Sequence, residues 1–331
     1  MKSFFALALA GAVSATPMTS NDFKFMRYIV EHNKEYNTLE EYNMRKSNYE
    51  WMDKEIVRWN SSNGSSVHGH NWTSDLSRAE YEGMLGLKNQ PKPKRANGEV
   101  FTGEGVAIPA SNNWCSSGQY CNPVKNQGSC GSCWAFATTA SMESAHAIFY
   151  STLYSLSEQQ LVSCSGSFGN GGCQGGWYYW AWDYAVTTPI TTEAVYPYTS
   201  GSHGVTGRCT YTAGSGVMYD LSQTDVAANT TAILAAITNQ PVAVAIEADT
   251  SYFQSYTSGV LNDGTACGTN IDHAVTAVGF GTDSVGGPYY IVRNSWGTSW
   301  GNQGYVWIGQ GCGSLGCCGI NQYVAFPTVK A

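Results

Sequence analysis

The sequence predicts an α+β protein, on the basis of three observations. Residues 23–60 show two amphipathic helical patterns, the second with apolar side chains three and four positions apart from Tyr49 to Trp59. Another helix is expected from Cys133 through WAFATTASMESAHAIFY. Strands are expected in QPVAVAIEA, HAVTAVGF and YYIVRNSW, because their alternating apolar pattern is typical of strands.

The first element is a short apolar segment at the N-terminus. MKSFFALALAGAVSATP has a basic residue, Lys2, then an apolar run from Phe4 to Val13 and small residues up to Ala15. This is the pattern of a secretory signal peptide, so we expect removal of residues 1–15. No later stretch reaches about 18 uncharged apolar residues. We therefore expect a soluble protein, either secreted or held in a lysosome-like or digestive vacuole.

The composition changes near residue 95. Residues 16–106 contain 12 Lys or Arg and 13 Asp or Glu, whereas residues 107–331 contain 4 and 11. With so few cations, the second part is a poor candidate for binding nucleic acid or an anionic membrane. The connecting segment LKNQPKPKRANGEVFTGEG has the Pro, Gly and basic residues of an exposed, cleavable linker. The sequence thus predicts a removable N-terminal region followed by a separate domain.

The cysteine count points to one special thiol. All 11 cysteines lie at or after Cys115. In an oxidising compartment cysteines pair, and an odd number leaves one over. The remaining cysteine would be either an intermolecular partner or a reactive thiol.

The stretch NQGSCGSCWAF holds two cysteines three positions apart, Cys130 and Cys133. A thioredoxin-like redox pair would have the tryptophan before it, but Trp134 follows. A zinc site would need a second close pair at finger-like spacing, which does not follow, so we expect neither metal nor cofactor. A nucleophile beside a structural thiol would need a distant histidine and an Asn or Asp. NIDHAVTAVGF supplies His273, and YYIVRNSWGTSWGNQGY supplies Asn294.

These motifs resemble the papain family of cysteine proteases, and the resemblance runs from about Met18 to Pro327. The N-terminal region resembles the pro-region of cathepsin L-like members. Their pattern E-x3-R-x3-F-x2-N-x3-I-x3-N falls, with departures at the third and fourth positions, on Glu41, Arg45, Tyr49, Met52, Ile56 and Asn60. Their pattern G-x-N-x-F-x-D falls, with a threonine in place of the aromatic, on Gly69, Asn71, Thr73 and Asp75.

The resemblance implies a preproenzyme with three parts. Residues 1–15 would be the signal peptide, residues 16–106 an inhibitory propeptide and residues 107–331 a papain-like peptidase domain. The implied fold has two lobes: a helical lobe that carries Cys133, and a β-barrel-like lobe that carries His273 and Asn294. An extended peptide would bind in the cleft between the lobes.

Four residues receive catalytic roles by resemblance and by their chemistry. Cys133 would be the nucleophile, because a helix N-terminus and an adjacent His273 imidazolium both favour the thiolate. His273 would later protonate the leaving amine, and Asn294 would orient its ring by accepting from the far nitrogen. Gln127 resembles the family's oxyanion donor, which acts with the backbone N–H of Cys133. Trp296 resembles the family's indole lid over the contact between His273 and Asn294.

The substrate-binding positions are assigned by motif alone. They are Gly175, Gly176, Trp177, Tyr178, Ala245, Ile271 and Tyr323. The pocket that selects the side chain would be mainly apolar, with Tyr323 as a bulky floor. We therefore expect a preference for Leu or Val over Phe, and rejection of Arg, because no acidic residue lines the floor.

The resemblance also implies three disulfides, Cys130–Cys173, Cys164–Cys209 and Cys267–Cys318. Four cysteines remain, and their short spacings favour the local bridges Cys115–Cys121 and Cys312–Cys317. Because Cys317 adjoins Cys318, the second of these assignments stays open. N-glycosylation sequons occur at Asn60, Asn63, Asn71 and Asn229.

The expected function is that of a cysteine endopeptidase, made as a monomeric zymogen that its own propeptide inhibits. Its partners would be that propeptide and peptide or protein substrates. Activation would cut the chain between about Lys92 and Ile108. Acid would favour it, because protonating Asp75 or Glu41 would weaken the charged propeptide.

Two other functions were weighed for the chain. An inhibitor or binding protein acting through residues 16–106 is opposed by the intact set of catalytic residues in the second part. An exopeptidase would need an extra segment that blocks the cleft, and no His-His insertion lies between Cys133 and Cys173.

Overall fold

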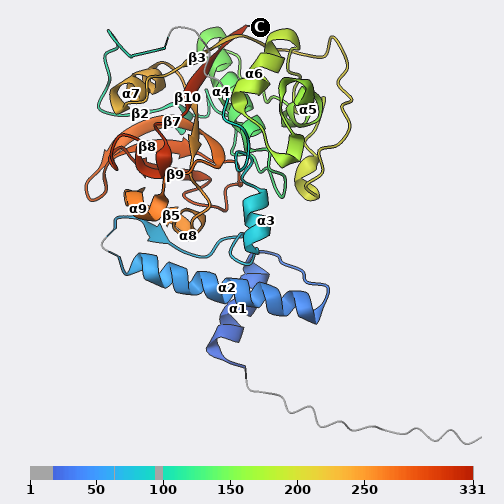
Figure 1. Cartoon of the computed structure of the whole chain (residues 1–331), viewed down its shortest axis with the longest axis vertical. Coiled ribbons are helices and arrows are strands. Elements are labelled where there is room, and N and C mark those ends of the chain that lie inside the picture. Colours follow the sequence, from blue (N-terminus) through green and yellow to red (C-terminus); the bar gives the residue numbers. More distant parts are fainter. Residues whose placement is uncertain (1–17, 63, 94–99, 331) are drawn as a thin grey trace, which may run out of the picture.

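The computed structural model describes residues 18–62, 64–93 and 100–330. The expected signal peptide and the middle of the expected cleavage segment lie outside these ranges. Figure 1 shows a helical hairpin at one end of the molecule, packed below a body of helices and strands. In the described ranges we find no helix that is both long and apolar enough to span a bilayer.

The N-terminal region begins with the two helices that the sequence predicts. These are α1 (Ser20–Glu31) and α2 (Leu39–Asn60), followed by β1 (Val67–His68) and α3 (Arg78–Gly83). Thr19, Thr38 and Ser77 cap the three helices by accepting backbone N–H groups. Phe25, Tyr28 and Tyr49 form a small core between the first two helices.

The predicted apolar stripe of α2 faces inward. Tyr49, Met52 and Ile56 are buried. Trp59 packs on the sheet-side core of the body, and its Nε1 donates to Ser251 Oγ over 3.0 Å. The helix therefore lies across α8 (Ser251–Gln254), while β1 pairs with β5 (Tyr256–Ser258) of the body.

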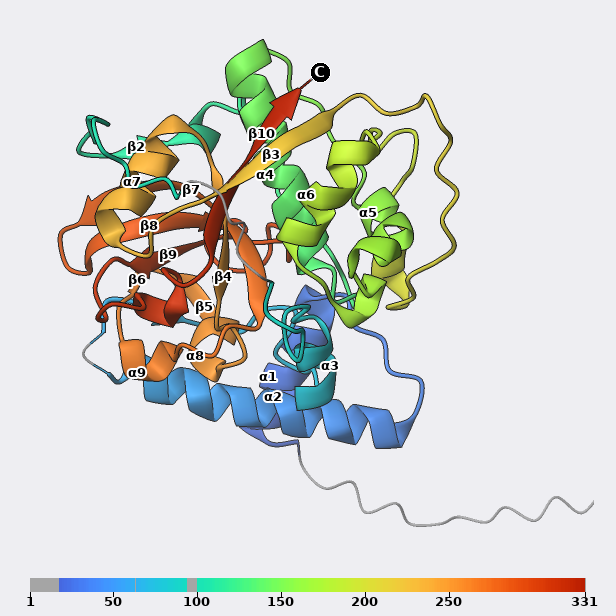
Figure 2. The same ribbon diagram turned by 45° about the horizontal axis from the view of Figure 1, so that its top comes forward.

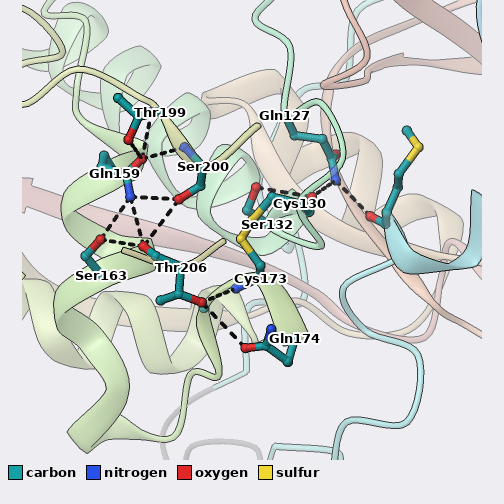
Figure 3. The surroundings of a disulfide bond; sticks show 12 residues. Gln127, Cys130, Ser132, Gln159, Ser163, Cys173, Gln174, Thr199, Ser200 and Thr206 are labelled. Carbon is teal, nitrogen blue, oxygen red and sulfur yellow. Dashed lines mark hydrogen bonds between the residues drawn. A yellow bond between two sulfur atoms is a disulfide. The ribbon is translucent and has the colours of Figure 1, made fainter. Parts of the chain in front are cut away.

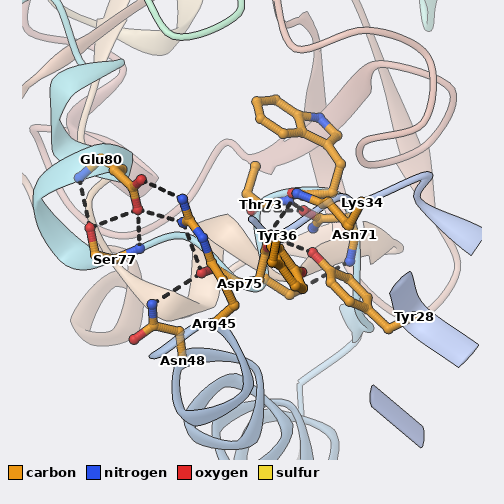
Figure 4. Close-up of polar contacts among 12 residues, drawn as sticks. Tyr28, Lys34, Tyr36, Arg45, Asn48, Asn71, Thr73, Asp75, Ser77 and Glu80 are labelled. Carbon is orange, nitrogen blue, oxygen red and sulfur yellow. Dashed lines mark hydrogen bonds and ion pairs between the residues drawn. The ribbon is translucent and has the colours of Figure 1, made fainter. Parts of the chain in front are cut away.

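A buried carboxylate joins the hairpin to the loop that follows it (Figure 4). Asp75 accepts hydrogen bonds from the hydroxyls of Tyr28 and Tyr36 at 2.8 Å. It also forms an ion pair with Lys34 at 2.7 Å. Arg45 donates twice to Glu80, over 2.6 and 2.7 Å, which fixes α2 to α3. These charged contacts hold the pro-region motifs in place because few apolar residues are available there.

The first lobe of the body is helical. It contains α4 (Cys133–Tyr150), α5 (Glu158–Cys164), α6 (Tyr178–Thr187) and the short 3-10 helices η2 (Ser165–Phe168), η3 (Gly172–Gln174) and η4 (Ser200–Ser202), whereas η1 (Trp114–Ser116) lies against the sheet of the second lobe. The sequence predicts one apolar face on α4, but every residue from Cys133 to Ala147 is buried. The reason is that α4 lies between α5 and α6 on one side and the sheet on the other (Figure 2).

The second lobe is built on an eight-stranded sheet, and the three predicted strand runs form three of its strands. The order is β3 (Tyr219–Asp225), β10 (Val324–Lys330), β4 (Val242–Ile246), β7 (His273–Asp283), β8 (Gly287–Arg293), β9 (Tyr305–Gly309) and β6 (Val260–Leu261), with β2 (Asn112–Asn113) beside β7. Shorter helices border it: α7 (Thr230–Asn239), α9 (Gly264–Cys267) and η5 (Cys317–Gly319). Because α4 covers one face, β4 is buried on both faces and not alternately.

Five disulfides link cysteines within the body. The pairs are Cys115–Cys121, Cys130–Cys173, Cys164–Cys209, Cys267–Cys318 and Cys312–Cys317, the same pairs that the sequence and its resemblance favour. Cys133 is left as a free, buried thiol. The odd cysteine is therefore the one at the start of α4.

The asparagine side chains of two predicted sequons, Asn71 and Asn229, form hydrogen bonds within the fold. Asn71 is only 2 % exposed, and its Nδ2 donates to the Gln254 carbonyl of the body. A glycan on Asn71 therefore cannot coexist with this docked arrangement. Asn229 is exposed, although its Oδ1 caps α7 by accepting from Ala232.

Candidate active site

Three element ends bring the expected catalytic residues together. Cys133 is the first residue of α4, His273 is the first residue of β7, and Asn294 directly follows β8. Because α4 packs against β7, and β7 pairs with β8, these ends meet at the junction of the two lobes. The sequence separates Cys133 from His273 by 140 positions, so only the fold makes them neighbours.

Cys133 is fully buried in this structure. Its Sγ accepts from two backbone N–H groups, that of Ala274 at 3.4 Å and that of Gly86 at 3.3 Å. Burial raises the pKa of the Cys133 thiol to about 11, and these two hydrogen bonds offset it only in part. In this covered form burial therefore favours the neutral thiol, whereas the thiolate expected from the sequence concerns the reacting enzyme.

His273 is also buried and neutral. Its Nε2 lies 2.8 Å from Asn294 Oδ1, so the neutral ring donates to the amide oxygen as expected. The ring lies 4.9 Å from the ring of Trp296, which covers it. Burial lowers the pKa of His273 to about 4, although the contact with Asn294 acts in the opposite direction. The predicted imidazolium is therefore absent from this covered form.

Burial at the junction of the lobes is the largest cause of each shift, because a thiolate and an imidazolium lose solvation when they are buried. Trp296 of the body covers His273, whereas Gly86 of the N-terminal region covers the sulfur of Cys133. Removing the N-terminal segment would therefore expose the Cys133 thiol to water and lower its pKa.

Gln127 already points its amide at a carbonyl oxygen. Its Nε2 donates to Met84 O over 2.8 Å and to Cys130 O over 2.9 Å. Its Oε1 accepts from Ser295 Oγ over 2.7 Å, which fixes the direction of the amide. The carbonyl of Met84, from the N-terminal region, therefore accepts from the same Gln127 N–H that was expected to bind a reacting carbonyl.

The segment after α3 runs through the junction between the lobes. Gly86 donates its N–H to Cys133 Sγ, and its carbonyl accepts from the N–H of Gly176 over 3.0 Å. Leu87 donates to the carbonyl of Asp272 over 2.9 Å. Pro91 accepts from Trp177 Nε1 over 2.9 Å. A segment of the N-terminal region, with turns at residues 86–89, therefore lies where a substrate was expected.

Leu87 of the N-terminal region belongs to the same buried cluster as several of the predicted substrate-binding residues. Leu87 is 3 % exposed and belongs to one buried cluster with Trp177, Tyr178 and Ala245, against which Ile271 and Tyr323 pack. The Tyr178 hydroxyl donates to the Tyr323 carbonyl over 2.8 Å, and the rings of Trp177 and Tyr323 are 5.2 Å apart.

The two predicted glycines lie directly beside this cluster. Gly176 forms the backbone contact with Gly86, and Gly175 has a φ of 111°. A side chain on Gly175 would also meet the Gly86 carbonyl at 2.2 Å, so both glycines allow close approach of a second chain.

Sequence reasoning missed two residues of the site. Ser295 orients Gln127, and its position next to Asn294 in the motif NSW was the available signal. Gly86 covers the thiol, but no pattern in the sequence marks it, because its role depends on a chain crossing from another region.

Comparisons with known proteins agree with this geometry. Residues 108–328 match the family described as papain family cysteine protease, and residues 25–81 match the cathepsin propeptide inhibitor domain (I29). Cysteine protease XCP2 of Arabidopsis thaliana is 36% identical, covering 98% of this chain and 96% of the relative. Cysteine proteinase 5 of Dictyostelium discoideum is 35% identical, covering 92% of each.

Solved structures of precursors are similar over nearly the whole chain. The recombinant stem bromelain precursor has a TM-score of 0.82 at 32% identity, covering 94% of this chain and 99% of that one. The digestive procathepsin L 3 of Tenebrio molitor larval midgut also has a TM-score of 0.82, at 28% identity, covering 94% of this chain and 100% of that one.

Gly86→Ala should uncover the buried thiol. An added Cβ would lie 2.1 Å from the Gly131 carbonyl oxygen and 3.1 Å from Cys133 Sγ, so the segment must move away. We expect iodoacetamide to label Cys133 in the intact chain about tenfold faster than in the parent. This corresponds to weakening the contact of the Gly86 segment with Cys133 by about 1.4 kcal/mol. Mass spectrometry would measure the rate, and the disulfide-bonded cysteines would not interfere.

Gly83→Ala is the matched control, because nothing lies within 4 Å of its added Cβ. Equal labelling rates for the two variants would contradict the covering role of Gly86.

Proposed function

Because this chain belongs to the papain family of cysteine proteases, we propose that its reaction is carried out by Cys133, His273, Asn294 and Gln127. The protein is a cysteine endopeptidase that hydrolyses peptide bonds, and it is made as a zymogen with a propeptide inhibitor domain. One observation carries the residue assignment. The free thiol lies under Gly86 of the propeptide, near a histidine that Asn294 orients and an amide that Ser295 orients.

The reaction follows from these contacts once the propeptide has left. The Cys133 thiolate attacks the scissile carbonyl carbon, and the carbonyl electron pair moves onto oxygen, stabilised by Gln127 Nε2 and the Cys133 backbone N–H. His273 gives its proton to the leaving amine, which breaks the C–N bond. Water then attacks the thioester with His273 as base, which frees the thiol.

The proposed boundaries keep the three parts expected from the sequence. Residues 1–15 would be the signal peptide, residues 16–106 the propeptide and residues 107–331 the peptidase domain. The activating cut would fall between about Lys92 and Ile108, after the segment that crosses the cleft. We propose that the monomeric protein enters the secretory pathway, reaches a lysosome-like or digestive vacuole or the exterior, and carries a glycan on Asn229.

Cys133→Ser should abolish peptidase activity and still give a folded zymogen, because a hydroxyl is too weakly acidic to form the ion pair. Asn294→Ala should lose less activity, since the ion pair persists with a poorly held ring. Hydrolysis of a fluorogenic peptide would measure both. Activity of the serine variant within tenfold of the parent would place the nucleophile elsewhere. An equal loss in both variants would contradict the orienting role of Asn294.

We further propose that the apolar pocket around Leu87 selects the substrate side chain. Leu87 of the propeptide belongs to the same buried cluster as Trp177, Tyr178 and Ala245, which supports an apolar pocket there. Burying a substrate leucine in it would contribute up to about 3 kcal/mol. None of the residues assigned to the pocket is acidic, which supports the expected rejection of Arg.

Tyr323→Ala should deepen the pocket and move the preference towards Phe. We expect kcat/KM for Phe substrates, relative to that for Leu substrates, to rise about tenfold. This is a typical effect of changing the size of an apolar pocket. Tyr219→Ala, on the exposed edge strand β3, is the control. If the parent enzyme turned over Leu, Phe and Arg substrates equally, the pocket assignment would be wrong while the catalytic one would stand.

Acid activation is proposed from buried groups at the docking surface of the propeptide. His68 is 3 % exposed, with its ring nitrogens 2.9 Å from Ser66 Oγ and 3.0 Å from Ser255 Oγ. Burial lowers the pKa of His68 from 6.5 to about 4. The free propeptide therefore binds a proton more readily than the docked one. Docking has its full strength above pH 6.5 and weakens as the pH falls towards 4.

The carboxylate of Glu80 acts in the same direction. Burial alone would raise the pKa of Glu80, but hydrogen bonds from Arg45 and Ser77 outweigh burial and lower it. The contribution of Glu80 is thus present at neutral pH and is lost when acid protonates it.

His68→Gln should shift propeptide release to lower pH. Glutamine retains a donor and an acceptor for the two serines but does not titrate. We expect release at pH 4.5 to slow about tenfold, the effect of one pKa unit. Conversion of zymogen to mature enzyme between pH 4 and 7 would be followed by electrophoresis. His203→Gln, in an exposed loop, is the control, and identical profiles for both variants and the parent would rule out His68.

A further inference from the structure

Both proposed oxyanion donors lie in one short loop, residues 127–133. Gln127 supplies a side-chain N–H at the beginning of this loop, and Cys133 supplies a backbone N–H at its end. The loop has little regular structure of its own, so other elements must fix its shape. On the side away from the cleft it packs against the segment from Tyr198 to Thr206.

Tyr198 contacts both ends of this loop. Its hydroxyl donates to the Gln127 carbonyl over 2.8 Å and lies 2.8 Å from Ser132 Oγ, one residue before the nucleophile. Its ring meets the ring of Phe136 on α4 edge-on, with centroids 5.0 Å apart. One hydroxyl therefore ties the main chain of Gln127 to the start of α4.

The segment that carries Tyr198 is itself held by a buried glutamine (Figure 3). Gln159 on α5 is 2 % exposed, and its Oε1 accepts from the N–H groups of Thr199 and Ser200 over 2.7 and 3.0 Å. Its Nε2 donates to Ser200 Oγ over 2.9 Å and to Thr206 O over 3.1 Å. Because both ends of this amide are used, the segment is fixed relative to α5.

The loop and the segment are in close backbone contact. Ser129 donates to the Gly201 carbonyl over 2.9 Å. Gly128 has a φ of 57°, and a Cβ there would lie only 2.3 Å from the Gly201 oxygen. No side chain separates the two chains at this point, so a shift of one is transmitted to the other.

We propose that Tyr198 is a positioning residue for the oxyanion site, acting through the main chain of Gln127. This inference rests on the proposed role of Gln127 as an oxyanion donor. The Tyr198 hydroxyl fixes the carbonyl of Gln127, while Ser295 fixes its side-chain oxygen. With both fixed, Nε2 remains aimed at the reacting carbonyl. Tyr198 touches neither the thiol nor the substrate.

The test is Tyr198→Phe in the activated enzyme, which keeps the ring against Phe136 and removes only the hydroxyl. We expect kcat for a fluorogenic peptide amide to fall about tenfold, less than the loss on deleting an oxyanion donor outright, with KM within twofold. Alkylation of Cys133 by iodoacetamide forms no oxyanion, so its rate and pH profile should stay within twofold of the parent.

Tyr196→Phe is the matched control. Its hydroxyl donates to the Arg208 carbonyl over 3.0 Å, away from the loop, so kcat should be unchanged. In a Gln127→Ala background, Tyr198→Phe should lower kcat by less than twofold, because the Gln127 side chain through which Tyr198 acts is then absent.

The outcomes separate the inference from the function on which it rests. An unchanged kcat in Tyr198→Phe, an equal loss of alkylation rate, or an undiminished effect in the Gln127→Ala background would each overturn the inference alone. An unchanged kcat in Gln127→Ala itself would overturn the oxyanion role, and the inference with it.

Discussion

The packing of α4 against β7 is the contact on which the rest of the molecule depends. It joins the helical lobe to the sheet and, together with α5 and α6 on the other side, buries α4 from Cys133 to Ala147. The N–H of Ala274, directly after the histidine, donates to the cysteine sulfur, so even the strand backbone takes part. The thiol and the imidazole can react together only because two hydrophobic cores meet along this line.

The propeptide uses the same junction to keep the enzyme inactive. It covers the Cys133 sulfur with the N–H of Gly86, and burial of this sulfur favours the neutral thiol. In addition, the Met84 carbonyl accepts from the side-chain amide of Gln127. Both contacts come from one short part of the propeptide.

The two regions are stabilised in different ways, and this difference suits their roles. The body has large apolar clusters and five disulfides, which do not respond to moderate acid. The propeptide has a small aromatic core, and charged contacts centred on Asp75 and Arg45 hold it together. The propeptide therefore depends on charged contacts more than the body does.

The sequence by itself determined the helices of the propeptide, the three main strands and the presence of one unpaired cysteine among 11, because periodicity, cysteine count and motif are local or additive properties. It could not determine the protonation state of Cys133, since that depends on burial under Gly86 of the propeptide. It also missed Ser295 beside Gln127 and the burial of Asn71 in the docked propeptide. These features arise where segments far apart in the chain bury one another, and burial and long-range contact exist only in the tertiary structure.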